Sequence, residues 1–418
     1  MVAPTCNAFK PPRDWVIPSF GGGVKRRRFL PQGVAGKRVI PLGPVTPPGG
    51  GTAMSADAVT GWVLTIAAGL RLGQAKTLAH LVEAAVHAGR STLSAIGRRL
   101  PGATAVKHKI KRAWRFCDND RVHVADVMIA VVRPLTRKRK KPLLVALDWT
   151  DIRGFHTFMA AAVMKGRAVP LLWASYTTGQ LHRSQNSFEE GLLWLLVTML
   201  PPKVKVILLA DRGFGRAELA RTCEQLGIGY LIRVRPEVRV SHPSYKGRLD
   251  DYSVRKGMRR VLAGAEYRSD RAVSLNVVIR WKKGLPAKRD EPWFLMTNLS
   301  GNAVRLTELY ARRMAVEELF RDGKDGRYGL GLGQTLVGTT GRLDRLILIL
   351  ALAIILLIGL GRLARGRFRP GTWCSSNDPD ECSDVTVGRR MWASIREPPE
   401  QLIDEVVRAT LLSVGNWG

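Results

Sequence analysis

Residues 204–210 read VKVILLA, an apolar run that is buried enough to form a central strand of a parallel sheet. Asp211 follows this run directly, and Gly213 allows a tight turn into a helix near residues 216–226. A further apolar run, residues 229–234, predicts the next strand. Strand, turn, helix and strand in this order predict a sheet with a covering helix, with a carboxylate where the first strand ends.

Three more strands are predicted upstream, at residues 143–149 (LLVALDW), 158–164 (FMAAAVM) and 168–175 (AVPLLWAS). A helix near residues 188–200 separates them from residues 204–210, so the whole series predicts an α/β fold with a mixed sheet and flanking helices. Asp148 stands at the end of the first strand, as Asp211 does at the end of the fourth. If these two strands are neighbours, both carboxylates face one crevice above the sheet.

A helix-prone segment without proline, residues 306–324 (LTELYARRMAVEELFRDGK), supplies a third carboxylate. Four of its side chains share one face of a single helix, at about 0°, 300°, 340° and 320°. They are Tyr310, Arg313, Glu317 and Lys324. Glu318 is turned about 100° from Glu317, so this spacing selects Glu317 as the residue that faces the two aspartates.

Asp148, Asp211 and Glu317 together predict a metal site. Three crowded carboxylates repel one another, their pKa values rise, and a divalent cation removes that penalty. Ligation by oxygen alone with open positions favours Mg²⁺ or Mn²⁺. Two such ions about 4 Å apart can activate a water or a 3′-hydroxyl and stabilise the leaving oxygen of a phosphodiester.

The charge of the chain indicates what that chemistry acts on. The 418 residues include 66 Lys and Arg against 34 Asp and Glu, a formal charge of +32. Such an excess favours a polyanionic partner, and nucleic acid is the first candidate; the alternative is a solvated basic surface. The five cysteines form no C-x-x-C pair, which argues against a disulfide framework or a zinc module and favours a reducing, cytoplasmic location.

Residues 54–141 predict an all-helical, DNA-binding domain. Helices are expected near residues 58–72 and 75–88, followed by a short helix at 92–100 with Ser91 as its N-cap. The next helix, near residues 104–116, is basic, and the pair is typical of a helix-turn-helix; the alternative is a helical bundle with a solvated basic face. The candidate DNA-binding residues on it are Lys107, Lys109, Lys111, Arg112 and Arg115.

The remaining segments are assigned by composition. Residues 1–53, basic and rich in Pro and Gly, predict a disordered leader. We expect translation to begin at Met54, and the alternative is a basic arm that grips DNA. Residues 236–300 predict a β-strand insertion, and the apolar residues 346–360 (LILILALAIILLIGL) are too few for an ordinary membrane span and predict a buried core helix. Residues 367–418 form a tail of unknown role that closes with a helix near residues 400–411.

These motifs resemble those of insertion-sequence DDE transposases of the fourth family, which is marked by Y-x2-R-x3-E-x6-K. Tyr310, Arg313, Glu317 and Lys324 match all four positions, and LDWTD around Asp148 and ADRGFGR around Asp211 resemble the first and second acidic motifs. The resemblance covers roughly residues 75–360. It implies a ribonuclease H-like catalytic core, at residues 142–235 and 301–366, interrupted by the insertion at 236–300.

The resemblance also implies roles for single residues. The three carboxylates bind the metals, and Tyr310, Arg313 and Lys324 contact phosphates near the cleaved end. Trp293 matches a tryptophan on which hairpin-forming members stack a flipped base; the alternative is an ordinary strand aromatic. The implied function is cut-and-paste transposition of inverted-repeat ends by a dimer on double-stranded DNA, without a membrane. The alternatives are a metal-dependent nuclease without strand transfer, a catalytically inactive DNA-binding protein and an integral membrane protein.

Overall fold

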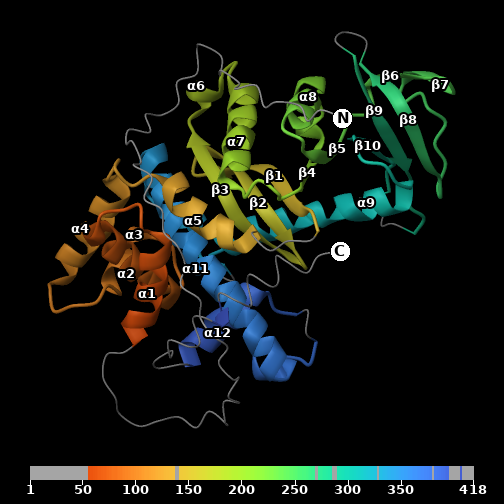
Figure 1. Cartoon of the computed structure of the whole chain (residues 1–418). Helices are drawn as coiled ribbons and strands as arrows, with labels where there is room; N and C mark the ends of the chain where they lie inside the picture. Colours follow the sequence, from red (N-terminus) through yellow and green to blue (C-terminus); the bar gives the residue numbers. More distant parts are fainter. Residues whose placement is uncertain are drawn as a thin grey trace. The chain divides into compact units, whose positions relative to one another are not determined.

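The structure, a computed structural model, describes residues 55–136, 141–268, 272–284, 290–326, 329–378, 381–394 and 405–406. The predicted leader, residues 1–53, lies outside the described residues, as does all but residues 405–406 of the helix predicted near residues 400–411. Figure 1 shows the mixed α/β arrangement of the described elements. An N-terminal helical region is followed by strands, which form one mixed sheet, and by helices, which pack on that sheet.

The centre of the sheet is built from strands that the sequence predicts. They are β1 (Leu143–Ile152), β2 (Phe155–Met164), β3 (Arg167–Tyr176), β4 (Val206–Ala210) and β5 (Gly229–Arg233). β1, β4 and β5 run parallel, while β2 and β3 are antiparallel to their neighbours. The inner strands are almost wholly buried, which is the reason that continuous apolar runs encode them.

Residues 236–300 contain strands that extend this same sheet. They are β6 (Arg239–His242), β7 (Tyr245–Arg248), β8 (Arg259–Tyr267), β9 (Val273–Arg280) and β10 (Trp293–Thr297). β10 pairs antiparallel with β5, so the strand order of the ten-stranded sheet is β3-β2-β1-β4-β5-β10-β9-β8-β6-β7. The β-rich character expected of this segment is therefore present, and its strands join the central sheet through β5.

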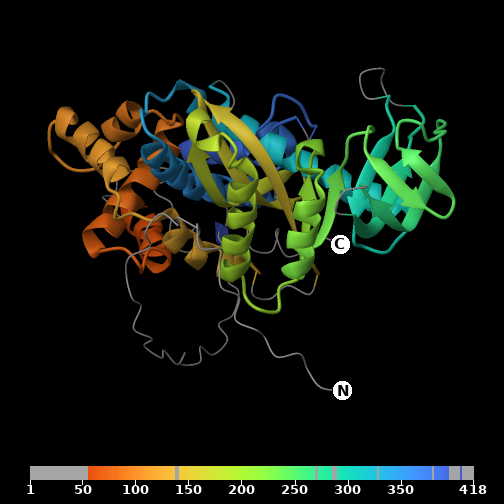
Figure 2. The same ribbon diagram turned by 90° about the horizontal axis from the view of Figure 1, so that it is seen from above.

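Helices cover both faces of the central strands. α7 (Gln185–Met199) and α8 (Ala217–Gln225) lie side by side on one face (Figures 1 and 2). The other face carries α10 (Ala315–Lys324) and α11 (Thr340–Arg367), both of which contact β3. The short helix α6 (Thr178–Leu181) follows β3. Side chains that alternate along β1 consequently meet α10 on one side and α7 on the other.

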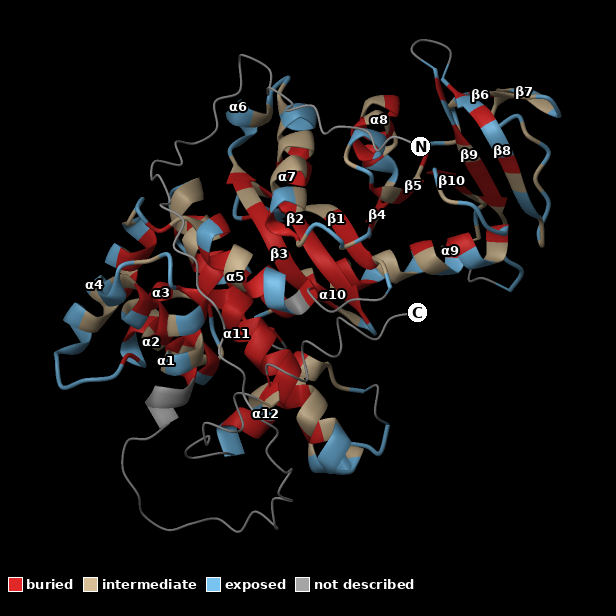
Figure 3. Ribbon diagram, viewed as in Figure 1, coloured by how far each residue is buried: buried red, intermediate tan, exposed pale blue. Residues whose placement is uncertain are grey.

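α11 is the long apolar helix predicted at residues 346–360. Among the described helices it is the one long and apolar enough to cross a membrane, but 89% of its apolar window is buried inside the protein. Figure 3 shows this helix buried along most of its length. The prediction of a buried core helix is confirmed, and the helix is about twice as long as its apolar run.

The N-terminal region consists of α1 (Ser55–Ile66), α2 (Leu72–Ala88), α3 (Leu93–Arg98), α4 (Val106–Asp118) and α5 (Val124–Thr136). Ser91 as the N-cap of α3 is wrong. Thr92 fills that role, because its Oγ1 accepts a hydrogen bond from the Ala95 N–H, whereas Ser91 is buried and its N–H donates to the Leu330 carbonyl. α3 and α4 cross closely at Gly97, where a Cβ would lie 2.6 Å from the Ile110 Cα.

The single helix predicted at residues 306–324 is also wrong. The segment forms α9 (Ala303–Ala311), a 3₁₀ turn (Arg312–Met314) and α10. The two helices pack on different strands, since α9 contacts β8 and β9 while α10 contacts β1, β2 and β3. One straight helix cannot follow both parts of a twisted sheet, and the tighter 3₁₀ turn accommodates the change.

The tail folds back on the core helix. α12 (Asp384–Ser394), which the sequence did not predict, crosses α11 at two glycines. A Cβ on Gly361 would lie 2.0 Å from the Asp384 carbonyl oxygen, and a Cβ on Gly388 would lie 2.0 Å from the Leu357 carbonyl oxygen. The backbones of α11 and α12 are therefore in contact at both positions, and only a glycine, which has no Cβ, leaves room for this contact.

Candidate active site

The two aspartates lie side by side where β4 ends. The parallel ladder pairs Leu147 of β1 with Ala210, the last residue of β4, so the next residues along the chain are Asp148, still in β1, and Asp211, directly after β4. The sequence predicted Asp148 at the end of its strand, and this is wrong. β1 continues to Ile152 because it pairs with β2. Asp211 caps the 3₁₀ turn Arg212–Phe214, its Oδ1 accepting the Gly213 N–H at 2.9 Å.

Glu317 reaches the same place from the helix that faces these strands. The Arg313 guanidinium connects the two elements: Nη1 is 3.0 Å from Asp148 Oδ2 and Nη2 is 2.6 Å from Glu317 Oε1. The Arg313 side chain is only 12% exposed. Charge-assisted bonds of this length are strong, and they hold α10 against β1. Residues far apart in the chain, 148, 211 and 317, are thus brought to one place, with Arg313 between two of them.

The surroundings of Asp148 disfavour its charge. Burial raises the pKa of the Asp148 carboxyl to about 6; Arg313 lowers it, and the neighbouring Asp211 and Glu317 charges raise it again. An ordinary aspartate has a pKa near 3.9. At neutral pH Asp148 is therefore an anion whose charge lowers the free energy of unfolding. Such unfavourable charges are common at functional sites, where the activity requires them.

Asp148→Asn is expected to stabilise the metal-free protein, by about 2 to 3 kcal/mol at pH 8. Because the folded-state pKa is raised, the neutral acid contributes stability that is fully present below pH 4 and lost as the pH rises to about 6. The gain over wild type should therefore be absent at pH 4, grow between pH 4 and 6 and stay constant above. Urea unfolding with a chelator at these pH values measures it.

The matched control for this measurement is Asp151→Asn. Asp151 is exposed, three residues along β1, and accepts a bond from the Gly154 N–H that asparagine can also accept. Its substitution should change the free energy of unfolding by less than about 0.5 kcal/mol at every pH. A gain for Asp148→Asn that did not vary with pH would contradict the electrostatic explanation.

The donor set fits a divalent cation in chemistry. Asp148, Asp211 and Glu317 offer oxygen ligands alone, which suits Mg²⁺ or Mn²⁺, and a cation would offset the repulsion that raises the Asp148 pKa. Within the part of the chain that the structure describes, no three Asp, Glu, His or Cys side chains are already grouped to hold an ion. The cationic group between Asp148 and Glu317 here is the Arg313 guanidinium, and these two carboxylates together with Asp211 are the residues that would hold a metal.

Tyr310 and Trp293 form an aromatic pair beside this cluster. Their rings meet edge to face with centroids 5.3 Å apart, and the Arg233 guanidinium lies 5.8 Å from the Trp293 ring. Tyr310 is 4% exposed, and burial raises the pKa of its phenol. Trp293 is half-buried in β10 as the sequence placed it. The two residues to which the family resemblance assigns a DNA contact are therefore in contact with each other.

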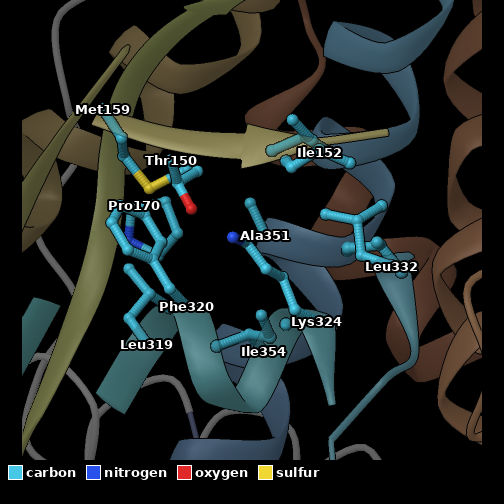
Figure 4. A pocket seen from close by; sticks show the side chains of 13 residues that line it. Thr150, Ile152, Met159, Pro170, Leu319, Phe320, Lys324, Leu332, Ala351 and Ile354 are labelled. Atoms are coloured by element: carbon cyan, nitrogen blue, oxygen red, sulfur yellow. The ribbon is translucent and has the colours of Figure 1, made fainter. Parts of the chain in front are cut away.

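Lys324 lines a small cavity of about 40 Å³ between β1 and the helices α10 and α11. Figure 4 shows its side chain reaching from α10 into this apolar space towards Thr150. Burial lowers the pKa of the Lys324 amine, and the charges of Asp151 and Asp148 oppose that effect. Lys324 thus lies on the same side of β1 as Asp148, with part of its chain in apolar surroundings.

The basic helix α4 presents only part of its charge to solvent. Lys107, Lys111 and Arg115, spaced four residues apart, are exposed on one face, while Lys109 is half-buried. Arg112 differs from the prediction: it turns towards α2, where Nη2 lies 2.9 Å from His80 Nδ1 and 3.3 Å from Thr77 Oγ1. The helical period explains this, because Arg112 falls on the side of α4 that packs against the bundle.

Arg216, which follows Asp211 closely, is buried and not a surface charge. It is 8% exposed and forms an ion pair with Glu189 of α7, a residue that the sequence analysis did not single out. The signal for this pair is weak: Glu189 is an acidic residue in a mostly apolar helix, and its partner is far away in the chain. Asp322 of α10 is also buried and pairs with Arg167.

This fold and site define an α/β protein with two neighbouring aspartates, one inside β1 and one directly after the end of the parallel strand β4. Comparison with protein families matches the transposase DDE domain at residues 139–356, just over half of the chain. The chain belongs to this family. A search of curated proteins found no match. DDE domains are polynucleotidyl transferases that use divalent metals, so the protein is an enzyme of DNA transposition that binds DNA.

Proposed function

We propose that the protein is a cut-and-paste transposase of the fourth insertion-sequence family with a ribonuclease H-like core. It would bind terminal inverted repeats, hydrolyse a phosphodiester and transfer the freed 3′-hydroxyl to target DNA. The observation that carries this proposal is the convergence of Asp148, Asp211 and Glu317 across β1, β4 and α10. The Y-x2-R-x3-E-x6-K signature supports the family, and the basic charge supports the substrate.

Asp148, Asp211 and Glu317 are the proposed catalytic residues and ligands of two divalent ions. Bound there, Mg²⁺ or Mn²⁺ would lower the pKa of the attacking hydroxyl and stabilise the leaving oxygen. Arg313 would release at least one of its carboxylates and offer its guanidinium to a DNA phosphate, which it can grip with two parallel bonds. Its position between Asp148 and Glu317 supports this role.

Tyr310 and Lys324 are proposed to contact phosphates near the cleaved end together with Arg313. Trp293 is the proposed platform for a flipped base, since it is only partly buried and its ring lies beside Tyr310 and Arg233. A transposase that joins two ends needs two active sites, so we propose a homodimer on DNA. Its place of action would be the cytoplasm, at the nucleoid.

Incubation with Mg²⁺ and a duplex that carries the terminal repeats of its own element tests the proposal. We expect cleavage at the repeat end followed by joining of the 3′-end to a second duplex, resolved on a denaturing gel. Cleavage without joining would instead indicate a nuclease. Binding without cleavage would indicate an inactive DNA-binding protein, and either result would refute the proposed cut-and-paste reaction.

The exposed face of α4 is proposed to contact DNA phosphates. Replacing Lys107, Lys111 and Arg115 with alanine should weaken DNA binding at every salt concentration. The slope of log affinity against log salt should fall by about 0.9 for each phosphate that is no longer neutralised by a side chain. Fluorescence anisotropy with a labelled duplex, across a series of salt concentrations, measures both effects.

Lys203 and Lys205 give the matched control for that experiment. Both are exposed and lie at the start of β4, at the opposite end of that strand from Asp211. Their replacement with alanine should leave the salt slope unchanged. Changes in proportion to the charges removed, three against two, would show that net charge alone, and not the α4 face, governs binding.

A further inference from the structure

A buried carboxylate on the far face of the sheet contacts the segments that follow both aspartates. Glu189, in α7, is 1% exposed. An anion removed from water in this way is strongly unfavourable unless charged and polar donors surround it. Each of its two oxygens has such a donor, and these donors lie beside the candidate active site.

The first donor is Trp149, the residue directly after Asp148. Its Nε1–H donates to Glu189 Oε1 at 2.8 Å, and the Gln185 amide donates to the same oxygen at 3.0 Å. Successive residues of a strand face opposite sides of a sheet, so Trp149 meets α7 while Asp148 meets Arg313 of the other layer. The Trp149 ring also stacks on Phe158 of β2, with centroids 4.9 Å apart.

The second donor is Arg216, which follows the turn that Asp211 begins. Its Nη1 pairs with Glu189 Oε2, and its backbone N–H donates to the Phe214 carbonyl at 2.8 Å. Phe214, in that turn, is stacked on Phe158, with centroids 5.8 Å apart. Glu189 therefore connects the chain after Asp148 to the chain after Asp211 through one fixed carboxylate.

We propose that Glu189 is a positioning residue that sets the spacing of the two aspartates for metal binding. It touches neither the carboxylates nor the reacting atoms, and it acts through Trp149 and Arg216. This inference rests on the proposed function, because it assigns the aspartates to the metal site. Groups that hydrogen-bond directly to metal ligands typically change metal affinity by about 10–100-fold when they are removed, so we expect the lower end of that range for Glu189, which acts through Trp149 and Arg216.

The test uses the full chain with Mn²⁺ alone as the probe, whose binding is measured by the paramagnetic resonance signal of free Mn²⁺. Glu189→Gln keeps the size of the side chain and removes its charge. Trp149→Phe keeps an aromatic ring and removes the N–H donor. Both should weaken Mn²⁺ binding about 10-fold and slow cleavage, with DNA affinity in a chelator unchanged.

Glu190→Gln is the matched control. Glu190 neighbours Glu189, and its Oε1 lies 3.4 Å from Nη2 of Arg216, whereas Glu189 pairs with Nη1. It should stay within about twofold of wild type in Mn²⁺ affinity. If Glu189→Gln fails to fold, Trp149→Phe decides. A folded Trp149→Phe or Glu189→Gln protein with wild-type Mn²⁺ affinity would overturn the inference and leave a merely structural ion pair.

Asp148→Asn, measured in parallel, separates this inference from the proposed function. Loss of Mn²⁺ binding in Asp148→Asn with none in the Glu189 and Trp149 variants would overturn the positioning role alone. Undiminished Mn²⁺ binding in Asp148→Asn would overturn the metal site itself, and the positioning role with it. Weakened binding in all three variants supports both.

Discussion

Glu317→Gln should reduce DNA cleavage by about a thousandfold or more while DNA binding is retained. Metal-assisted stabilisation of the reacting oxygens is worth several kcal/mol, and about 4 kcal/mol corresponds to that factor. Glutamine keeps the volume and one oxygen of Glu317, and Arg313 keeps its bond to Asp148. Cleavage of a repeat-end duplex in Mg²⁺ and gel-shift binding in a chelator are the two measurements.

Glu318→Gln is the control that the chain itself provides. Glu318 is the next residue on α10, and it faces Arg321 at 2.8 Å and Arg167 at 3.5 Å instead of the aspartates. An ion pair of this exposure is worth at most about 1 kcal/mol, so cleavage should change by no more than a few fold. Equal reductions of cleavage in the two variants would remove Glu317 from the catalytic site.

Gly388→Ala should destabilise the protein by about 3 kcal/mol or more. The added Cβ would lie 2.0 Å from the Leu357 carbonyl oxygen, and both groups belong to helix backbones that cannot turn aside as a side chain does. α12 would have to separate from α11 and expose buried neighbours such as Trp392. The midpoint of urea unfolding and the protection of α12 amides from hydrogen exchange report this destabilisation.

Gly366→Ala shows the contrast within α11. A Cβ there meets no atom within 4 Å, and alanine favours a helix over glycine by up to about 1 kcal/mol. That variant should be neutral or slightly more stable. If the Gly388→Ala variant were as stable as the Gly366→Ala variant, α11 and α12 would not be in close backbone contact at Gly388.

The central strands were predictable because each is buried on both faces and carries a continuous apolar run. Asp148 shows the limit of this signal. The run stops at Trp149, but β1 continues because the β1–β2 hairpin extends beyond the end of β4, turning at Arg153 and Gly154, both with positive φ. Asp148 thus lies in the middle of β1, beside the point where the parallel strand β4 ends. This position follows from the register between β1 and β4, which the sequence does not show.

The candidate site was predictable to the extent that its residues follow local patterns. The spacing of Arg313 and Glu317 brought both to one face despite the 3₁₀ turn just before α10, because the chain stays close to helical there. Glu189 and Arg216 could not be found in this way, since buried ion pairs between distant segments leave no periodic trace. The direction of Arg112 likewise depended on the position of α2.

The pairing of β5 with β10 means that residues 236–300 are not a detachable accessory. β5 has β4 as its partner on one side and β10 on the other. Excision of the segment would leave a row of unsatisfied amide and carbonyl groups along β5, an open template for aggregation. A shortened version of this enzyme would need another element to pair with the exposed edge of β5. Simple deletion of residues 236–300 is therefore expected to make the protein aggregate, whatever its effect on catalysis.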